Sequence, residues 1–231
     1  MKISVSTEAL EALSAEALVV IHEEGGMLGV SENAELAGHL TSFAKAVEKK
    51  QSRREWFCTV KEGSGVRTPH LLLESTTFES DTPHDEPLKA AAARAVAACR
   101  AHSIRKIAFA VHHKLAALKA AAILEGAMLG DFVDNRFKSK DENNRKALQL
   151  IFAVPAEEKK ETKKLLDRTQ LVSESVNHAR ELINAPHHVL TPQTMAEYAQ
   201  DLAKKHKMKC EVLDEKQLRR QGYELIWNVG R

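Results

Sequence analysis

Residues 107–129 read IAFAVHHKLAALKAAAILEGAML, and the hydrophobic pattern changes partway along this stretch. Ile107 to Val111 form a continuous apolar run with the length of a buried strand. The alanine-rich run from about Leu115 to Leu129 has instead the length and composition of a helix. Because a buried strand followed at once by a helix is the repeating unit of α/β sheets, the stretch predicts that class of fold.

The same alternation continues on both sides of this stretch. Further apolar runs of strand length are Val5, 17–21, 56–60, 71–73 and 148–154. Apolar residues at helical spacing lie at 36–47, with Ser31 as the expected N-cap, and Asp85 with Pro87 begins a helix that runs to about His102. We therefore predict a first α/β domain over residues 1–154, with helices on both faces of a mainly parallel sheet.

The composition changes after Pro155, where glutamates and then lysines follow one another at helical spacing. This pattern predicts a solvated linking helix that runs to about Asn184. The later elements are expected to be a helix from Thr191-Pro192 to His206, a strand at 211–213, a short helix capped by Asp214 and Gln217, and a strand at 225–229. Residues 155–231 are thus predicted to be a linking helix and the beginning of a second α/β domain.

Charge and apolar content exclude some classes of function. The 34 basic and 32 acidic side chains give a net charge of +2, which is too balanced to indicate nucleic-acid binding from bulk charge. No apolar run approaches the roughly 20 residues that cross a bilayer, and the amino terminus lacks the features of a secretory signal. We therefore expect a cytoplasmic protein without a membrane partner. Cys58, Cys99 and Cys210 have no CxxC spacing and are expected to be reduced core residues.

Residues that often bind metals are present but form no metal-binding motif. Each of the pairs His112-His113 and His187-His188 supplies one ligand at most, because neighbouring side chains point apart. The histidine at position 22 has no second histidine four residues on, where a zinc-protease helix would need it. Charge pairing in water is the expected role of a group of carboxylates and cations. This group consists of Asp131, Asp134, Arg136, Lys138, Lys140 and Asp141.

Two stretches resemble the leucyl aminopeptidase family, also called cytosol aminopeptidases. Residues 125–132, EGAMLGDF, with Phe137-Lys138 after them, are similar to the segment that ends the first domain of these enzymes. Residues 179–186, ARELINAP, with Thr191-Pro192 after them, are similar to the start of the catalytic domain. The order and spacing of the two stretches agree with the family, so the resemblance covers the chain from about Ala116 to its end.

The resemblance implies a macro-like first domain, a linking helix and a catalytic domain that removes amino-terminal residues from peptides with two divalent metals, zinc or manganese. The family holds these metals through a Gly-Lys-Gly stretch and an Asn-Thr-Asp-Ala-Glu-Gly-Arg stretch, and neither occurs in this sequence. We therefore expect the amino-terminal portion of such an enzyme, with no catalytic residue, metal ligand or cofactor of its own. Peptides would be substrates only of the complete enzyme, which the resemblance implies is a homo-oligomer, a hexamer built through its catalytic domains.

A binding role without catalysis is the alternative. Some bacterial members of the family bind DNA, and one basic patch in this chain has clustered charge that would suit phosphates. The patch consists of Lys45, Lys49, Lys50, Arg53 and Arg54. A solvated helix end explains the same charges, since no aromatic side chain interleaves with them to stack bases. Binding of an ADP-ribose-like ligand is a third option, although the loops lack a glycine-rich phosphate cradle.

The tail is expected to lack partners for its apolar side chains. Leu225, Ile226, Trp227 and Val229 would lie on a strand whose neighbours in the family's sheet are not in this sequence. An open apolar strand pairs readily with another molecule. We expect a stable first domain to about Val154, followed from about Gln170 by a tail that frays or self-associates.

Overall fold

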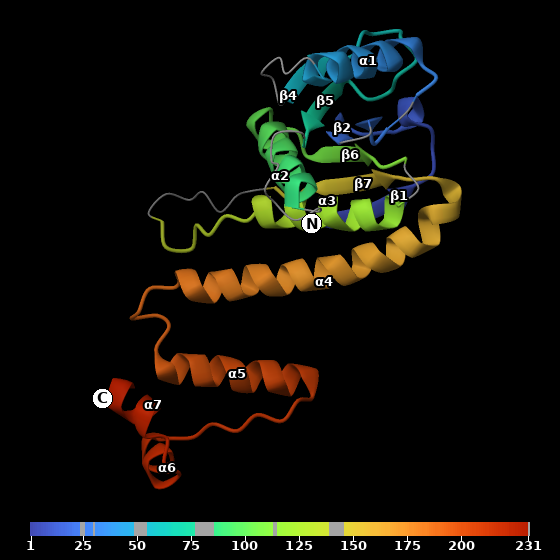
Figure 1. Cartoon of the computed structure of the whole chain (residues 1–231). Coiled ribbons are helices and arrows are strands. Elements are labelled where there is room, and N and C mark those ends of the chain that lie inside the picture. Colours follow the sequence, from blue (N-terminus) through green and yellow to red (C-terminus); the bar gives the residue numbers. More distant parts are fainter. Residues whose placement is uncertain are drawn as a thin grey trace. The chain divides into compact units, whose positions relative to one another are not determined.

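The computed structural model describes residues 1–23, 26–29, 31–48, 55–76, 86–112, 115–138 and 146–230. The chain divides into two compact units, Met1–Ala179 and Arg180–Arg231, and Figure 1 shows their elements in chain order. The first unit therefore extends beyond residue 154, where the sequence predicted the end of the first domain, and includes most of the linking helix. The division at residue 154 itself stays a prediction.

The first unit is built on one seven-stranded sheet (Figure 1). Its strands are β1 (Lys2–Ser6), β2 (Ala17–Glu23), β3 (Gly26–Met27), β4 (Glu55–Thr59), β5 (His70–Ser75), β6 (Lys106–Ala110) and β7 (Gln149–Ala153). The order across the sheet is β1-β7-β6-β2-β5-β4, and β3 pairs with β2. Every pair is parallel except β4 with β5 and β3 with β2. The prediction of a mainly parallel sheet is confirmed.

The central strand β2 shows why the sheet takes this form. Val19 pairs with Leu72 of β5 on one side and with Phe109 of β6 on the other. All three residues are fully buried. A strand covered on both faces needs a continuous apolar run rather than an alternating one, and Leu18 to Ile21 provide it.

Helices cover both faces of this sheet, as the sequence predicted. Helix α1 (Ala34–Glu48) packs on one face through Leu36, Leu40 and Phe43, beside the short 3-10 helix η1 (Leu10–Ala12). Helices α2 (Glu86–Ala101) and α3 (Ala116–Gly130) pack on the opposite face. The N-cap of α1 differs from the prediction, because the side-chain oxygen of Asn33 accepts from the N–H groups of the first turn. Ser31 instead accepts from the N–H of Asn33 and donates to Glu11.

Helices α2 and α3 approach closely because α3 carries two glycines. A Cβ on Gly126 would lie 2.1 Å from the carbonyl oxygen of Lys89, and one on Gly130 would lie 2.5 Å from the Cβ of Ala93. Both distances are too short for any side chain, so only glycine fits at these positions. Lys89 and Ala93 are one turn apart on α2, and the two glycines are one turn apart on α3. This contact explains the glycine of the Glu125-Gly126 stretch in packing terms.

The linking helix is α4 (Lys159–Asn184), preceded by a 3-10 turn, η2 (Ala156–Glu158). Within the first unit, α4 buries Thr162, Leu166 and Ser173 on one face. The hydroxyl oxygens of Thr162 and Ser173 have no hydrogen-bond partner among the described residues. The face by which α4 packs is thus small and polar, with a single leucine at its centre.

The described part of the second unit is helical. After the end of α4 come α5 (Pro192–His206), α6 (Glu215–Arg220) and α7 (Glu224–Gly230). The predicted caps are confirmed, since Thr191 and Thr194 form a capping box at α5 and Asp214 and Gln217 form one at α6.

The strands predicted at 211–213 and 225–229 are wrong. Residues 211–213 have no regular structure, and 224–230 form α7. A strand needs a neighbour for its backbone N–H and C=O groups, and the described residues of this unit contain no other strand. A helix satisfies those groups internally, and the guanidinium of Arg219 lies 4.9 Å from the ring centroid of Trp227.

The three cysteines are free, but they differ in burial. Cys99 is fully buried, and burial raises the pKa of its thiol to about 12. Cys58 is half-buried, with its pKa also raised by burial. Cys210 is exposed, so its prediction as a core residue is wrong, because the segment that carries it packs against no core. Across the described ranges, no helix combines the length and the apolar character needed to span a bilayer.

Candidate functional site

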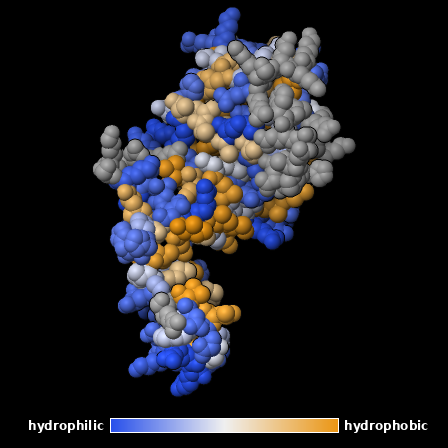
Figure 2. Space-filling model, turned by 60° about the vertical axis from the view of Figure 1, so that its left-hand side comes forward, coloured by the Kyte–Doolittle hydropathy of each residue, from blue (hydrophilic) through white to orange (hydrophobic). Residues whose placement is uncertain are grey.

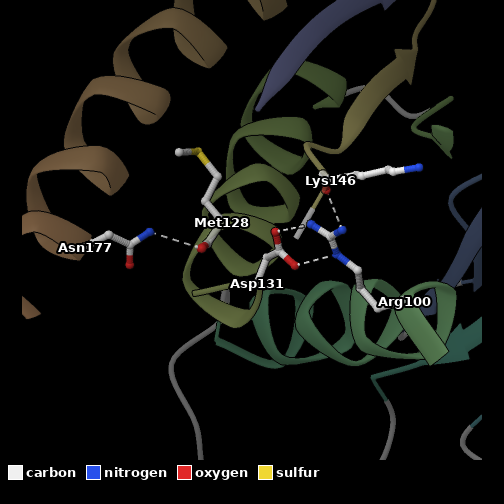
Figure 3. Close-up of polar contacts among 5 residues, drawn as sticks. All are labelled: Arg100, Met128, Asp131, Lys146 and Asn177. Atoms are coloured by element: carbon white, nitrogen blue, oxygen red, sulfur yellow. Dashed lines mark hydrogen bonds and ion pairs between the residues drawn. The ribbon is translucent and has the colours of Figure 1, made fainter. Parts of the chain in front are cut away.

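A polar cluster joins the last turn of α2, the end of α3 and the segment before β7 (Figure 3). Arg100, in the last turn of α2, donates from Nε and Nη2 to the two carboxylate oxygens of Asp131, at 2.9 and 2.8 Å. Its Nη1 donates to the backbone oxygen of Lys146 at 2.7 Å. Asp131 follows the last residue of α3, and Lys146 precedes β7. One guanidinium therefore joins three elements that are far apart in the sequence.

Helix α4 joins the same cluster through Asn177. The Asn177 side-chain amide donates to the backbone oxygen of Met128, in the last turn of α3, at 3.2 Å. Figure 3 shows this contact on the opposite side of α3's end from Arg100. Glu174 and Asn177 line a hollow of about 270 Å³ together with Phe132 and Asp131. Helix ends leave carbonyl oxygens unpaired, so the amide stabilises α3 while it fixes the position of α4 along it.

A second group of titratable side chains lies where the parallel strands end. Glu74, in β5, is fully buried, and its Oε2 accepts from Nε of Arg94 at 3.2 Å. Arg94 also donates to the backbone oxygen of Ser75. Burial raises the pKa of Glu74 to about 8 against the opposing charge of Arg94, and the Glu55 carboxyl raises it further. Glu55 stands opposite Glu74 across the antiparallel pair. At neutral pH the Glu74 carboxyl therefore keeps its proton.

Two histidines, His22 and His112, have pKa values that burial lowers. His22 is only 6% exposed, and burial lowers its pKa. His112 also has a pKa lowered by burial. Their Nδ1 and Nε2 atoms, respectively, have no partner among the described residues. The next residue of β2, Glu23, pairs with Lys119 of α3. No group of three potential metal ligands occurs in the described ranges.

The predicted site residues have different outcomes. Lys45 is exposed on α1, while Lys49, Lys50, Arg53 and Arg54 lie outside the described residues. The basic patch therefore stays a prediction.

Asp131 and Asp134, the two aspartates of the predicted charged group that the structure describes, both form ion pairs. Asp134 pairs with Arg136 at 2.7 Å, and that guanidinium lowers the pKa of Asp134 to about 2. Asp131 pairs with Arg100, which the sequence analysis does not single out because it lies 31 positions away. His113, Lys140 and Asp141 lie outside the described residues. The rings of His187 and His188 meet edge to face, with centroids 5.6 Å apart.

Comparison with known proteins matches two parts of the chain to one family. The amino-terminal domain of the cytosol aminopeptidase family matches residues 79–141, and the catalytic domain of the same family matches residues 177–231. The probable cytosol aminopeptidase of Solibacter usitatus is 29% identical over 239 residues, which cover 100% of this chain and 45% of that protein. The chain spans about half the length of the curated relatives that match it throughout.

Solved structures show the same fold. A tomato leucine aminopeptidase variant superposes with a TM-score of 0.69 at 22% identity, over 95% of this chain and 46% of the other. The bottromycin maturation enzyme BotP in complex with Mn superposes with a TM-score of 0.61 at 19% identity, over 89% of this chain and 40% of the other. The two family matches lie in order along the sequence, and the polar cluster draws Arg100 from the first match and Asn177 from the second. The chain belongs to the cytosol aminopeptidase family.

Proposed function

We propose that this chain is the amino-terminal part of a two-metal aminopeptidase, which in its complete form removes amino-terminal residues from peptides. The observation that carries the proposal is the ordered match of the family's two domains to a chain about half as long as its relatives. In such an enzyme, two metals would activate a water and polarise the scissile carbonyl. The structural neighbour BotP is known in complex with Mn, and this supports divalent metals in the complete enzyme.

The described residues of this chain do not fit a two-metal site. Such a site needs several carboxylates that converge on one point, and no cluster of this kind occurs in the described ranges. The half-buried Asp131 carboxylate and the buried Glu74 carboxyl group each lie beside an arginine instead, Arg100 and Arg94 respectively. We infer that the chain alone is inactive, and that its residues build the first unit and hold the linking helix in place.

The test compares the chain alone with a fusion protein. The chain would be joined to the remainder of the Solibacter usitatus relative, beyond the matched region, and both proteins would be given leucyl p-nitroanilide with zinc or manganese. We expect metal-dependent release of nitroaniline from the fusion protein and none above background from the chain alone. Release by the chain alone would show that it contains a complete site. A folded but inactive fusion protein would contradict the proposed function.

The finer expectations belong to the same proposal. We infer a macro-like first domain, a location in the cytoplasm and a homo-oligomer built through the catalytic domain, and the name of the relatives, cytosol aminopeptidase, supports the location. Binding of DNA through the basic patch is the alternative function. Lys45 is exposed, as that function requires. A gel shift that weakens as salt rises would favour DNA binding, and no shift at low salt would end it.

A further inference from the structure

Helix α4 carries a second apolar surface in addition to the face it buries. Val172, Val176, Ala179 and Ile183 follow one another at intervals of four, three and four residues. This spacing places them in one stripe along the helix, about a quarter of a turn from the face that buries Leu166 and Ser173. Val172 is 50% exposed, Val176 41% and Ile183 80%. We call these four residues the α4 stripe.

The composition of α4 makes this exposure informative. Single exposed apolar residues are ordinary on protein surfaces. Here four of them align on a helix whose packing face is the more polar one, with Thr162 and Ser173 fully buried and without hydrogen-bond partners among the described residues. Figure 2 shows hydrophobic residues at the surface among hydrophilic ones on the face that it presents. A helix with an aligned apolar stripe usually packs that stripe against another surface.

We propose that the α4 stripe is a docking surface for the part of the catalytic domain that cytosol aminopeptidases have beyond the region matched by this chain, and that this part binds even as a separate polypeptide. The proposal rests on the proposed function. Two observations favour this occupant. The match to the catalytic domain begins at residue 177, within the stripe, and more than half of the relative from Solibacter usitatus lies outside the region that this chain matches.

The second unit supports the same occupant. Of its apolar residues in the described range, only Ala203 is buried, while Leu225 and Val229 are more than 80% exposed. A segment with so little core of its own needs another surface to bury its side chains. A second copy of this chain is the weaker choice, because the heptad spacing of the stripe lasts for fewer than the three to four heptads that indicate a coiled coil.

The experiment coexpresses the full chain with the remainder of the Solibacter usitatus relative as a separate, tagged polypeptide. Wild-type chain should copurify with it, and dilution followed by mass photometry would give the dissociation constant. The test variant is Val172→Asp with Val176→Asp. Both positions are exposed, so the variant should fold with an unchanged circular dichroism spectrum. We expect its dissociation constant to rise by at least about 100-fold, because each valine would be buried in the complex.

Leu171→Asp is the matched control. Leu171 is 66% exposed on the same helix, but it lies more than a quarter of a turn around the helix from the centre of the stripe. The control should bind within about threefold of wild type, since changes of about two- to threefold are ordinary for surface substitutions. The inference is overturned if the double variant binds like wild type or if the control loses binding to the same extent.

Two further outcomes separate this inference from the proposed function. An active fusion protein, with no association between the separate polypeptides, would overturn the docking proposal and leave the function standing. The chain could instead associate with itself, lose that association in the double variant and fail to bind the relative's remainder. This result would identify a second copy as the occupant and would also overturn the docking proposal.

Discussion

Substituting Gly126 by alanine tests the packing of α2 against α3 most directly. The new Cβ would lie 2.1 Å from the carbonyl oxygen of Lys89 and 2.6 and 2.7 Å from its Cα and carbonyl carbon. All three are backbone atoms, so no side chain can rotate away to make room. Ordinary contact begins near 3.4 Å, so the two helices would have to separate locally by about 1 Å.

Two opposing effects set the size of the change. Alanine favours the helical state over glycine by about 1 kcal/mol. Overpacking typically costs about 1–3 kcal/mol, and we expect the upper end here because the obstacle is backbone. The net loss should be about 2 kcal/mol in the free energy of unfolding. For a chain of this size, that loss lowers the melting temperature by roughly 4–8 °C.

Gly38→Ala is the control for this measurement. Gly38 lies inside α1, and a Cβ there would meet nothing within 4 Å. The same chemical change should therefore stabilise the protein and raise its melting temperature by roughly 2–4 °C. Thermal unfolding of both variants, followed by circular dichroism, gives the comparison. If Gly126→Ala raised the melting temperature as Gly38→Ala does, the close approach of α2 and α3 would be refuted.

Three further predictions concern charge and hydroxyl burial, and one concerns the tail. Arg100→Ala should lower the free energy of unfolding by about 2–3 kcal/mol, because it deprives the half-buried Asp131 carboxylate of two charged hydrogen bonds. Urea unfolding measures this change, and a loss below roughly 0.5 kcal/mol, the size expected for an ion pair at the surface, would argue against the cluster. Ser173→Ala should raise the free energy of unfolding by about 1 kcal/mol, since it removes a buried hydroxyl without a hydrogen-bond partner among the described residues. If the same titration showed a lower free energy of unfolding, the hydroxyl would have a hydrogen-bond partner after all. Because the pKa of Glu74 is raised to about 8, the folded state holds a proton that the unfolded state releases above about 4.5, so stability should fall as pH rises between these values. Glu74→Gln should flatten that fall in melting temperature, and parallel curves for the two proteins would contradict the assignment. Amides of residues 192–230 should exchange hydrogen faster than those of the sheet, and equal protection in a demonstrated monomer would sink this expectation.

The sheet of the first unit could be predicted from sequence because its strands are unusually clear. Leu18 to Ile21 and Ile107 to Val111 are continuous apolar runs, and runs of this length are typical of strands covered on both faces. The long alanine-rich helices between them are equally distinct. The order of the strands could not be read in this way, because pairing partners such as β1 and β7 are almost 150 positions apart and share no local signal.

The errors in the tail have a different cause. The strand predicted at Leu225 to Val229 depends on the expectation that these residues follow the family's catalytic sheet, and short apolar runs suit either a strand or a helix. With no neighbouring strand among the described residues of the second unit, the helix is the form that satisfies the backbone. The error at Cys210 has the same origin, since burial depends on what packs against a segment.

The candidate site shows the limit of motif reasoning. The sequence identifies Asp131 as a charge-paired residue, but its partner Arg100 lies on another helix and belongs to no motif. Asn177 likewise has an ordinary sequence context on α4, and its contact with Met128 follows only from the way the helices pack. The one local signal for this cluster is a basic residue in the predicted last turn of a helix, which is the position of Arg100.

The pairing of β1 has a consequence for how the chain is made. Lys2 to Ser6 are synthesised well before β7, their only strand partner among the described residues, which begins at Gln149. At about 5–20 residues per second, the first strand waits roughly 7–30 s before its neighbour is synthesised. During that time its backbone edge is open to other nascent chains or to chaperones. Strand β1 is therefore exposed to crowding during translation, although it ends up paired within the finished sheet.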